Sequence, residues 1–260
     1  TLLKFFILLI AATPASAADV PPPGGLRVMT YNIRYANPGD GANCWENRRD
    51  AVAATIARNA DIVGMQEVLA GQARDLRERL PGFAWVIRGR EVAAADGEAC
   101  PVVWREEMFA MLDSGTFWLS TSPEVPGSKA WDTSLPRICT WVKLRAKSNG
   151  GIVHVFNVHL DHRSAEARKN GAALVAARAA AVAGPVLVLG DFNEPRGGPA
   201  TASFGSSQGW REVTAGSPAE GGGTFNGWSK QGNFPHIDFI LTRGIESRGA
   251  KILQPITAGG

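Results

Sequence analysis

Carboxylate, amide and imidazole side chains recur in this sequence at the ends of apolar, strand-like segments. Asn32 and Glu67 follow the first two of these segments, and Asp191 and Asn193 follow a later one. Their oxygen atoms are the ligands that a hard cation such as Mg²⁺ prefers, with Mn²⁺ as an alternative. His159, at the end of another segment, can exchange a proton with a phosphoryl oxygen or a leaving group. Together these residues predict metal-assisted attack of water on a phosphorus atom.

Each of these residues also has an ordinary structural interpretation. An Asn or Asp after a strand most often forms a turn or caps a helix, and a lone His or Glu is often a solvated surface residue. The combination therefore carries the prediction. A second group, Arg137, Asp161, His162 and Asn226, is predicted to line the same pocket and bind substrate. The alternatives are an edge salt bridge for Arg137 and, for Asp161 and His162, a polar loop that caps the next helix.

The elements that must position these residues are short strands in clusters, with helices between the clusters. Nine segments have the composition of strands: residues 26–31, 62–66, 102–104, 109–112, 116–119, 138–144, 152–160, 186–189 and 237–241. Three segments have helical spacing: residues 45–58, 72–80 and 164–183. Ser164 is the expected N-cap of the last helix, and Gly184 follows its end. This order predicts an α+β sandwich in a single domain, not a strictly alternating βαβ fold.

Length and composition exclude several classes of protein. The chain has 260 residues, of which 45% are hydrophobic and 20% charged, so it can bury a core and is too apolar for a disordered protein. The formal net charge of +3 is small for a dedicated nucleic-acid binder. Collagen-like, coiled-coil and transmembrane architectures are excluded as well, and no stable membrane anchor is expected. We expect the protein to be a monomer.

The first residues have the pattern of a secretion signal. Lys4 precedes an apolar run over residues 5–12, and the small residues Ala15 and Ala17 flank a typical cleavage position. A buried helix is the alternative, but Pro14 and the proline-glycine segment at residues 21–25 argue against it. We therefore predict a signal peptide over residues 1–17, a linker over 18–25 and the folded domain over 26–260. This arrangement implies export to the periplasm or the medium.

Three cysteines remain after the predicted cleavage. Cys139 lies in an alternating, strand-like segment and is expected to be a buried thiol. Cys44 and Cys100 lie in polar, glycine-containing loops. Because an exported protein meets an oxidising compartment, these two could form a disulfide, and two unrelated free thiols are the equal alternative.

Five stretches, in this order and spacing, resemble the endonuclease/exonuclease/phosphatase superfamily, which shares the fold of pancreatic-type deoxyribonuclease. They are residues 29–35 (MTYNIRY), 45–49 (WENRR), 112–120 (LDSGTFWLS), 159–164 (HLDHRS) and 190–193 (GDFN). The resemblance covers residues 26–258 and points to a bacterial exported branch similar to nocturnin-type and deadenylase-type enzymes. It implies a four-layer α/β/β/α sandwich, in which two mostly antiparallel sheets are flanked by helices.

The resemblance also implies a role for each matching residue. Glu67 corresponds to the principal magnesium ligand, and Asn32 to the residue that helps hold metal and phosphate. His159 corresponds to the histidine that contacts the scissile phosphate and can protonate the leaving group. Asp191 corresponds to the aspartate that orients or deprotonates the attacking water, and Asn193 to its phosphate-binding neighbour. Asp238 corresponds to an aspartate that supports a final catalytic histidine, so the catalytic set is His159, Asp191, Asn193 and Asp238.

The end of the sequence departs from the family pattern. Family members finish with a Ser-Asp-His segment and a last strand, whereas this sequence stops at Gly260 and begins at Thr1. We therefore expect a sequence truncated at its C-terminus and lacking its true start. The predicted function is an exported, Mg²⁺-dependent phosphoesterase whose substrate is nucleic acid or a small phosphodiester. The alternatives are a phosphomonoesterase acting on sugar or inositol phosphates, and a catalytically inactive binding module.

Overall fold

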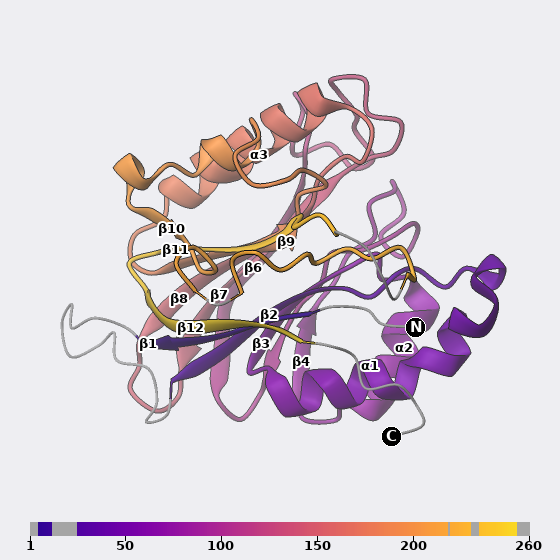
Figure 1. The fold of residues 1–260 in the computed structure, drawn as a ribbon, viewed down its shortest axis with the longest axis horizontal. Coiled ribbons are helices and arrows are strands. Elements are labelled where there is room, and N and C mark those ends of the chain that lie inside the picture. The colour runs from indigo at the N-terminus through magenta and orange to yellow at the C-terminus, as the bar shows by residue number, and fades with distance from the viewer. Residues whose placement is uncertain (1–4, 12–24, 218, 230–233, 254–260) are drawn as a thin grey trace.

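Two six-stranded β-sheets pack face to face, with helices on their outer sides (Figure 1). The computed structural model describes residues 5–11, 25–217, 219–229 and 234–253, and of residues 5–11 the backbone alone. The first sheet has the order β12(Glu246–Leu253), β1(Phe5–Ala11), β2(Leu26–Asn32), β3(Ile62–Gln66), β5(Val102–Arg105), β4(Phe83–Val86). The second has the order β10(Trp210–Glu212), β11(Asp238–Arg243), β9(Val186–Asp191), β8(Ile152–His159), β7(Ile138–Ala146), β6(Phe109–Trp118).

The helices cover opposite sides of this pair of sheets. They are α1(Trp45–Asn59) and α2(Ala70–Arg79) on the first sheet and α3(Ala165–Ala180) on the second, with short 3₁₀ turns η1(Pro38–Asn43), η2(Thr201–Ser203) and η3(Ser206–Gln208). Strands β2 and β3 are parallel, as are β8 and β9, and the other neighbouring pairs are antiparallel. The predicted four-layer sandwich of mostly antiparallel sheets is confirmed.

The core lies in three layers because the central strands are buried on both faces. Leu187 and Leu189 of β9 face the space between the two sheets. Val186 and Val188 of the same strand face α3. This alternation follows from the two-residue period of a strand, whose successive side chains point to opposite faces. A third layer joins α1 and α2 to the outer face of the first sheet.

The first strand lies in the segment that the sequence assigns to a signal peptide. Phe5–Ala11 pairs antiparallel with both β2 and β12 in the first sheet. A run of Phe, Ile and Leu favours strand formation, and in this place it covers edges that β2 and β12 would otherwise expose. The predicted cleavage site, most of the linker at 18–25 and the C-terminal residues 254–260 lie outside the described residues. Removal of residues 1–17 and export therefore stay predictions.

The cysteines do not form the bridge considered from the sequence. Cys44, Cys100 and Cys139 are all free thiols. Cys100 is buried because it packs with Trp118 and Ile138, whereas Cys44 is only half-buried where α1 begins. The expectation that Cys139 is a buried thiol is confirmed. Among the described residues, no helix is both long enough and apolar enough to span a bilayer.

Candidate active site

The polar residues singled out in the sequence meet at one edge of the sandwich because of how the strands pair. Asn32 ends β2, and Glu67 follows β3, which runs parallel to β2. In the second sheet, Asp191 at the end of β9 lies between two register partners, His159 on β8 and Asp238 on β11. Asn32 and Glu67 therefore come from one sheet, and the other three residues from the second.

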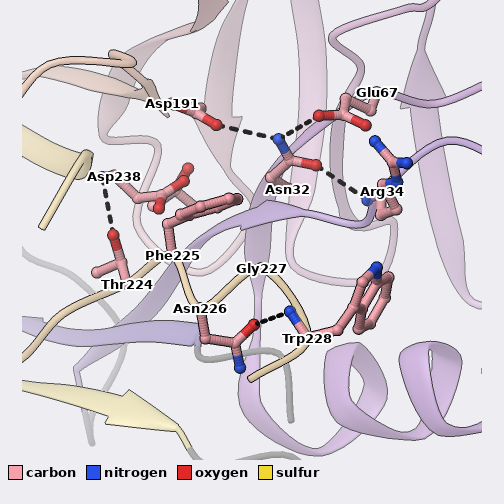
Figure 2. Close-up of a pocket in the computed structure, with 11 residues that line it drawn as sticks. Asn32, Arg34, Glu67, Asp191, Thr224, Phe225, Asn226, Gly227, Trp228 and Asp238 are labelled. Carbon is pink, nitrogen blue, oxygen red and sulfur yellow. Dashed lines mark hydrogen bonds between the residues drawn. The ribbon is translucent and has the colours of Figure 1, made fainter. Parts of the chain in front are cut away.

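A single amide group joins the two sheets at this edge. Nδ2 of Asn32 donates to Oε1 of Glu67 at 2.9 Å and to Oδ2 of Asp191 at 3.0 Å (Figure 2). Its Oδ1 accepts a hydrogen bond from the backbone N–H of Arg34 at 2.9 Å, which fixes the orientation of the amide. In this arrangement the nitrogen, not the oxygen, faces the two carboxylates. Asn32 could act as the predicted metal ligand only after its amide rotates.

Arg34, Glu67 and Asn193 adopt left-handed backbone conformations although none of them is a glycine. Their φ angles are 56° at Arg34, 61° at Glu67 and 49° at Asn193. Such angles are uncommon outside glycine and are retained when surrounding contacts impose them. Hydrogen bonds do so here: the N–H of Tyr35 donates to Oε2 of Glu67 at 3.0 Å, and the N–H of Asn193 donates to Oδ1 of Asp191 at 2.8 Å. The backbone turns therefore hold these two carboxylates in place.

Burial makes the carboxylates of the second sheet unusually hard to ionise. Burial, with a further contribution from the charge of Glu67, raises the pKa of Asp191 from 3.8 to about 6. Burial and the nearby charge of Asp191 raise the pKa of Asp238 well above its ordinary value. Oδ1 of Asp238 is buried and has no hydrogen-bond partner within the described part of the chain.

The carboxylates of Glu67 and Asp191 fit a divalent cation that keeps part of its water shell. Mg²⁺ is commonly held by one or two carboxylates together with water and substrate oxygens, and Glu67 and Asp191 are such a pair. Both already converge on the partly positive N–H₂ group of Asn32. Across residues 5–11, 25–217, 219–229 and 234–253, no group of three or more His, Cys, Asp or Glu side chains is placed so that it could hold a metal ion.

His159 lies next to the carboxylates but is a neutral, buried imidazole. Nδ2 of Asn193 donates to the backbone oxygen of Leu160 at 3.0 Å and lies 2.9 Å from Nε2 of His159, so this ring nitrogen accepts and the proton is on Nδ1. Burial and the positive charge of Arg137 lower the pKa of His159 well below 6.5. Its Nε2 lies 3.9 Å from Oδ2 of Asp191. The proposed protonation of a leaving group by His159 stays a prediction, and the contacts favour a role in orienting Asn193.

Arg137, Asp161 and His162 form a network beside His159. Nη2 of Arg137 lies 2.8 Å from Nδ1 of His162, which must accept because a guanidinium only donates. Asp161 is buried; burial alone would raise its pKa, but hydrogen bonds from backbone N–H groups and from Thr133 keep the pKa below its ordinary value. Its Oδ1 accepts from the N–H groups of Arg163 and Ser164, immediately before α3. Asp161 thus also has the loop-capping role considered from the sequence.

A cavity of about 270 Å³ opens beside the carboxylates. Of the predicted residues it brings together Asn32, Glu67, Asp191, Asp238 and Asn226 (Figure 2). His159, Asn193, Arg137, Asp161 and His162 are not part of its lining. The lining residues absent from the predicted set are Thr30, Arg34, Thr224, Phe225, Gly227 and Trp228.

Arg34 is the one positively charged residue among the described residues that line this cavity. Its Nε and Nη2 donate to the two carboxylate oxygens of Asp40, both at 3.0 Å, and its guanidinium lies 4.3 Å from the centre of the Tyr35 ring. Asp40 thus holds the guanidinium group of Arg34 beside Glu67. Arg34 is part of the matched MTYNIRY stretch, and that position was the only signal for it in the sequence.

Comparisons with known proteins give the same family as the sequence motifs. The family model described as the endonuclease/exonuclease/phosphatase family matches residues 29–259. A protein of that family from Bacteroides thetaiotaomicron is 32% identical in sequence, with a TM-score of 0.77; the match covers 83% of this chain and 80% of that one. A mannosyl-6-phosphatase from the same organism is 29% identical, with a TM-score of 0.79 and coverage of 89% and 100%.

More distant likeness extends to the fold alone. The catalytic domain of human nocturnin is 18% identical, with a TM-score of 0.64, and the match covers 84% of this chain and 81% of that domain. No curated protein matches the chain in sequence.

Proposed function

The chain belongs to the endonuclease/exonuclease/phosphatase family, and on that premise we propose that it is a divalent-metal-dependent hydrolase of small phosphomonoesters, including sugar phosphates. One observation carries this proposal: Glu67 and Asp191, from different sheets, converge on Asn32 at the edge of a cavity. The retained set of Asn32, Glu67, His159, Asp191 and Asn193 argues against the alternative of an inactive binding module.

Each residue has a chemical task in this proposal. Glu67 and Asp191 would hold the cation, which when bound offsets negative charge on the phosphoryl group. Asp191 also orients the attacking water and accepts its proton, a task that a carboxylate with a pKa of about 6 can perform near neutral pH. Asn193, held by His159, orients Asp191 through its N–H. Arg34 supplies a fixed positive group for a phosphoryl oxygen.

The choice of a small monoester rests on the cavity and on one relative. A volume of about 270 Å³ lies at the lower end of the range for ligand pockets. A nucleic-acid substrate would be expected to need a track of positive groups for its phosphates, whereas Arg34 is the one cation among the described lining residues. The mannosyl-6-phosphatase that resembles this chain in sequence and structure supports the same substrate class.

Hydrolysis of a small panel tests the proposal. The full chain would be given mannose 6-phosphate, bis-p-nitrophenyl phosphate, plasmid DNA and RNA, each with Mg²⁺, with Mn²⁺ and with EDTA. We expect release of inorganic phosphate from the monoester only when a divalent cation is present. Glu67→Gln should lower this release by about 10²–10³-fold, whereas Glu78→Gln, a change at an exposed carboxylate on α2, should leave it unchanged. Cleavage of the diesters without release from the monoester would refute the choice of bond, and turnover in EDTA would refute the metal requirement.

A further inference from the structure

A phenylalanine ring stands exposed at the mouth of the cavity. Phe225 is 53% exposed, although it lines the same cavity as the catalytic carboxylates. Figure 2 shows its ring extending toward Asn32. A single exposed aromatic residue is ordinary on a protein surface. This one lies where the alcohol part of a bound phosphomonoester would leave the reaction centre.

The segment that carries Phe225 is anchored directly to the catalytic strand. Oγ1 of Thr224 accepts hydrogen bonds from the backbone N–H of Ile237 at 3.0 Å and of Asp238 at 3.1 Å. The N–H of Thr224 donates to the backbone oxygen of Pro235 at 2.9 Å. The residue before Phe225 is thus tied to the start of β11, so the backbone that carries the ring has a fixed position relative to Asp238.

A tight turn then brings a second aromatic side chain to the same cavity. Gly227 and Trp228 have φ angles of 54° and 67°, and Oδ1 of Asn226 accepts from the N–H of Trp228 at 3.1 Å. The guanidinium of Arg48 lies 5.1 Å from the centre of the Trp228 ring and supports it. The ring of Phe225 folds over Gly227, where an added Cβ would lie 3.6 Å from its Cζ. The turn therefore presents two aromatic side chains to one cavity.

Asn226, which lines the cavity next to Phe225, carries a polar group without a hydrogen-bond partner among the described residues. Nδ2 of Asn226 is buried, and it donates to no acceptor within the described part of the chain. Figure 2 shows this amide nitrogen directed away from Asn32 and Asp191, so the exposed ring face of Phe225 is the feature of this wall of the cavity that a flat ligand could contact.

We propose that Phe225 is a specificity-determining residue on which the ring of the leaving alcohol packs, so that the protein prefers phosphomonoesters of ring-shaped alcohols over those of acyclic alcohols. This inference rests on the proposed phosphomonoesterase activity. A sugar ring and a nucleoside share the required flat face. Mannose 6-phosphate and adenosine 5′-monophosphate distinguish these two sources, and glycerol 3-phosphate is the acyclic reference.

The test compares Phe225→Ala and Phe225→Tyr with the unaltered protein on the three substrates. The alanine variant should raise KM about two- to twelvefold for whichever ring substrate is preferred, since aromatic contacts of this kind contribute about 0.5–1.5 kcal/mol and about 1.4 kcal/mol is a factor of ten. Its kcat should change little, because the ring does not touch the reacting atoms. The glycerol 3-phosphate reaction should change less than about twofold, and the tyrosine variant should restore the ring preference. Met111→Ala, at another exposed apolar residue on β6, is the matched control.

Each outcome bears on one of the two proposals. Equal loss on ring and acyclic substrates, or no loss on either, would overturn the role of Phe225 and leave the activity standing. Loss of kcat at unchanged KM would also overturn it, because packing of the leaving group acts on binding. If the unaltered protein releases phosphate from none of the three substrates, the proposed function fails first and the inference fails with it.

Discussion

Replacing Asp191 with asparagine should abolish activity and yet stabilise the metal-free fold at alkaline pH. Asp191 is buried, and the rise of its pKa from 3.8 to about 6 means that keeping it ionised disfavours the folded state. That rise corresponds to about 3 kcal/mol, at about 1.4 kcal/mol for each factor of ten in the proton dissociation constant. Asparagine removes this charge, but its amide nitrogen would face a donor, either Nδ2 of Asn32 or the N–H of Asn193. The lost hydrogen bond costs about 1 kcal/mol, so the net gain is about 2 kcal/mol.

The measurement is denaturant and thermal unfolding in EDTA at several pH values. At about pH 8 the midpoint temperature of Asp191→Asn should exceed that of the unaltered protein by roughly 4–8 °C. As the pH falls from about 6 toward 3.8, the folded protein takes up a proton on Asp191 before the unfolded chain does, so the unaltered protein becomes relatively more stable. The advantage of the variant should therefore approach zero near about pH 4.5. A variant that is less stable at about pH 8, or an advantage that does not change with pH, would refute the reasoning.

Two other predictions concern the metal and the thiols. Glu67→Gln should weaken Mg²⁺ binding measured by calorimetry and lower kcat/KM by about 10²–10³-fold. Mg²⁺ should raise the melting temperature of the unaltered protein but not that of the variant. An equal rise in both proteins would contradict the assignment of Glu67. Burial raises the pKa of Cys100 to about 12 and that of Cys139 well above its ordinary value. A thiol reagent at about pH 8 should therefore label Cys44 alone in the folded protein and all three thiols after unfolding. If only one thiol is labelled after unfolding without reductant, the other two form a disulfide.

Much of the fold could be predicted because its central strands are buried on both faces and are therefore almost wholly apolar. The bounds expected for β3 match the structure, and those for β9 differ by two residues at its end. Four strands were missed: β1 lies in the predicted signal peptide, β4 is short and only half-buried, and β10 and β12 lack this signature. β12 is largely exposed and carries charged residues along its length, and β10 has only three residues. The two segments expected at 109–112 and 116–119 form one strand, β6, which has an irregularity between Met111 and Asp113.

The candidate site, like the fold, could be predicted from the sequence only in part. Glu67 and Asp191 could be found because they follow directly after strands whose ends meet. Phe225 was missed because its segment is rich in glycine and lies outside the expected strands and helices; the anchor of Thr224 on β11 brings it to the cavity. The neutral state of His159 depends on burial and on an amide donor 34 residues away in the chain, which local sequence does not reveal.

The position of Asn32 has a consequence for how the active protein is assembled. Its two acceptors, Glu67 and Asp191, lie 35 and 159 residues away in sequence, one associated with each sheet. Either sheet folded alone would contain half of the reaction centre. In a refolding experiment, the rate at which activity returns should therefore report the docking of the two sheets. Circular dichroism would instead report the earlier formation of the secondary structure of each sheet. A collapsed intermediate with complete secondary structure should be inactive, so the return of turnover would measure the rate of the last folding step.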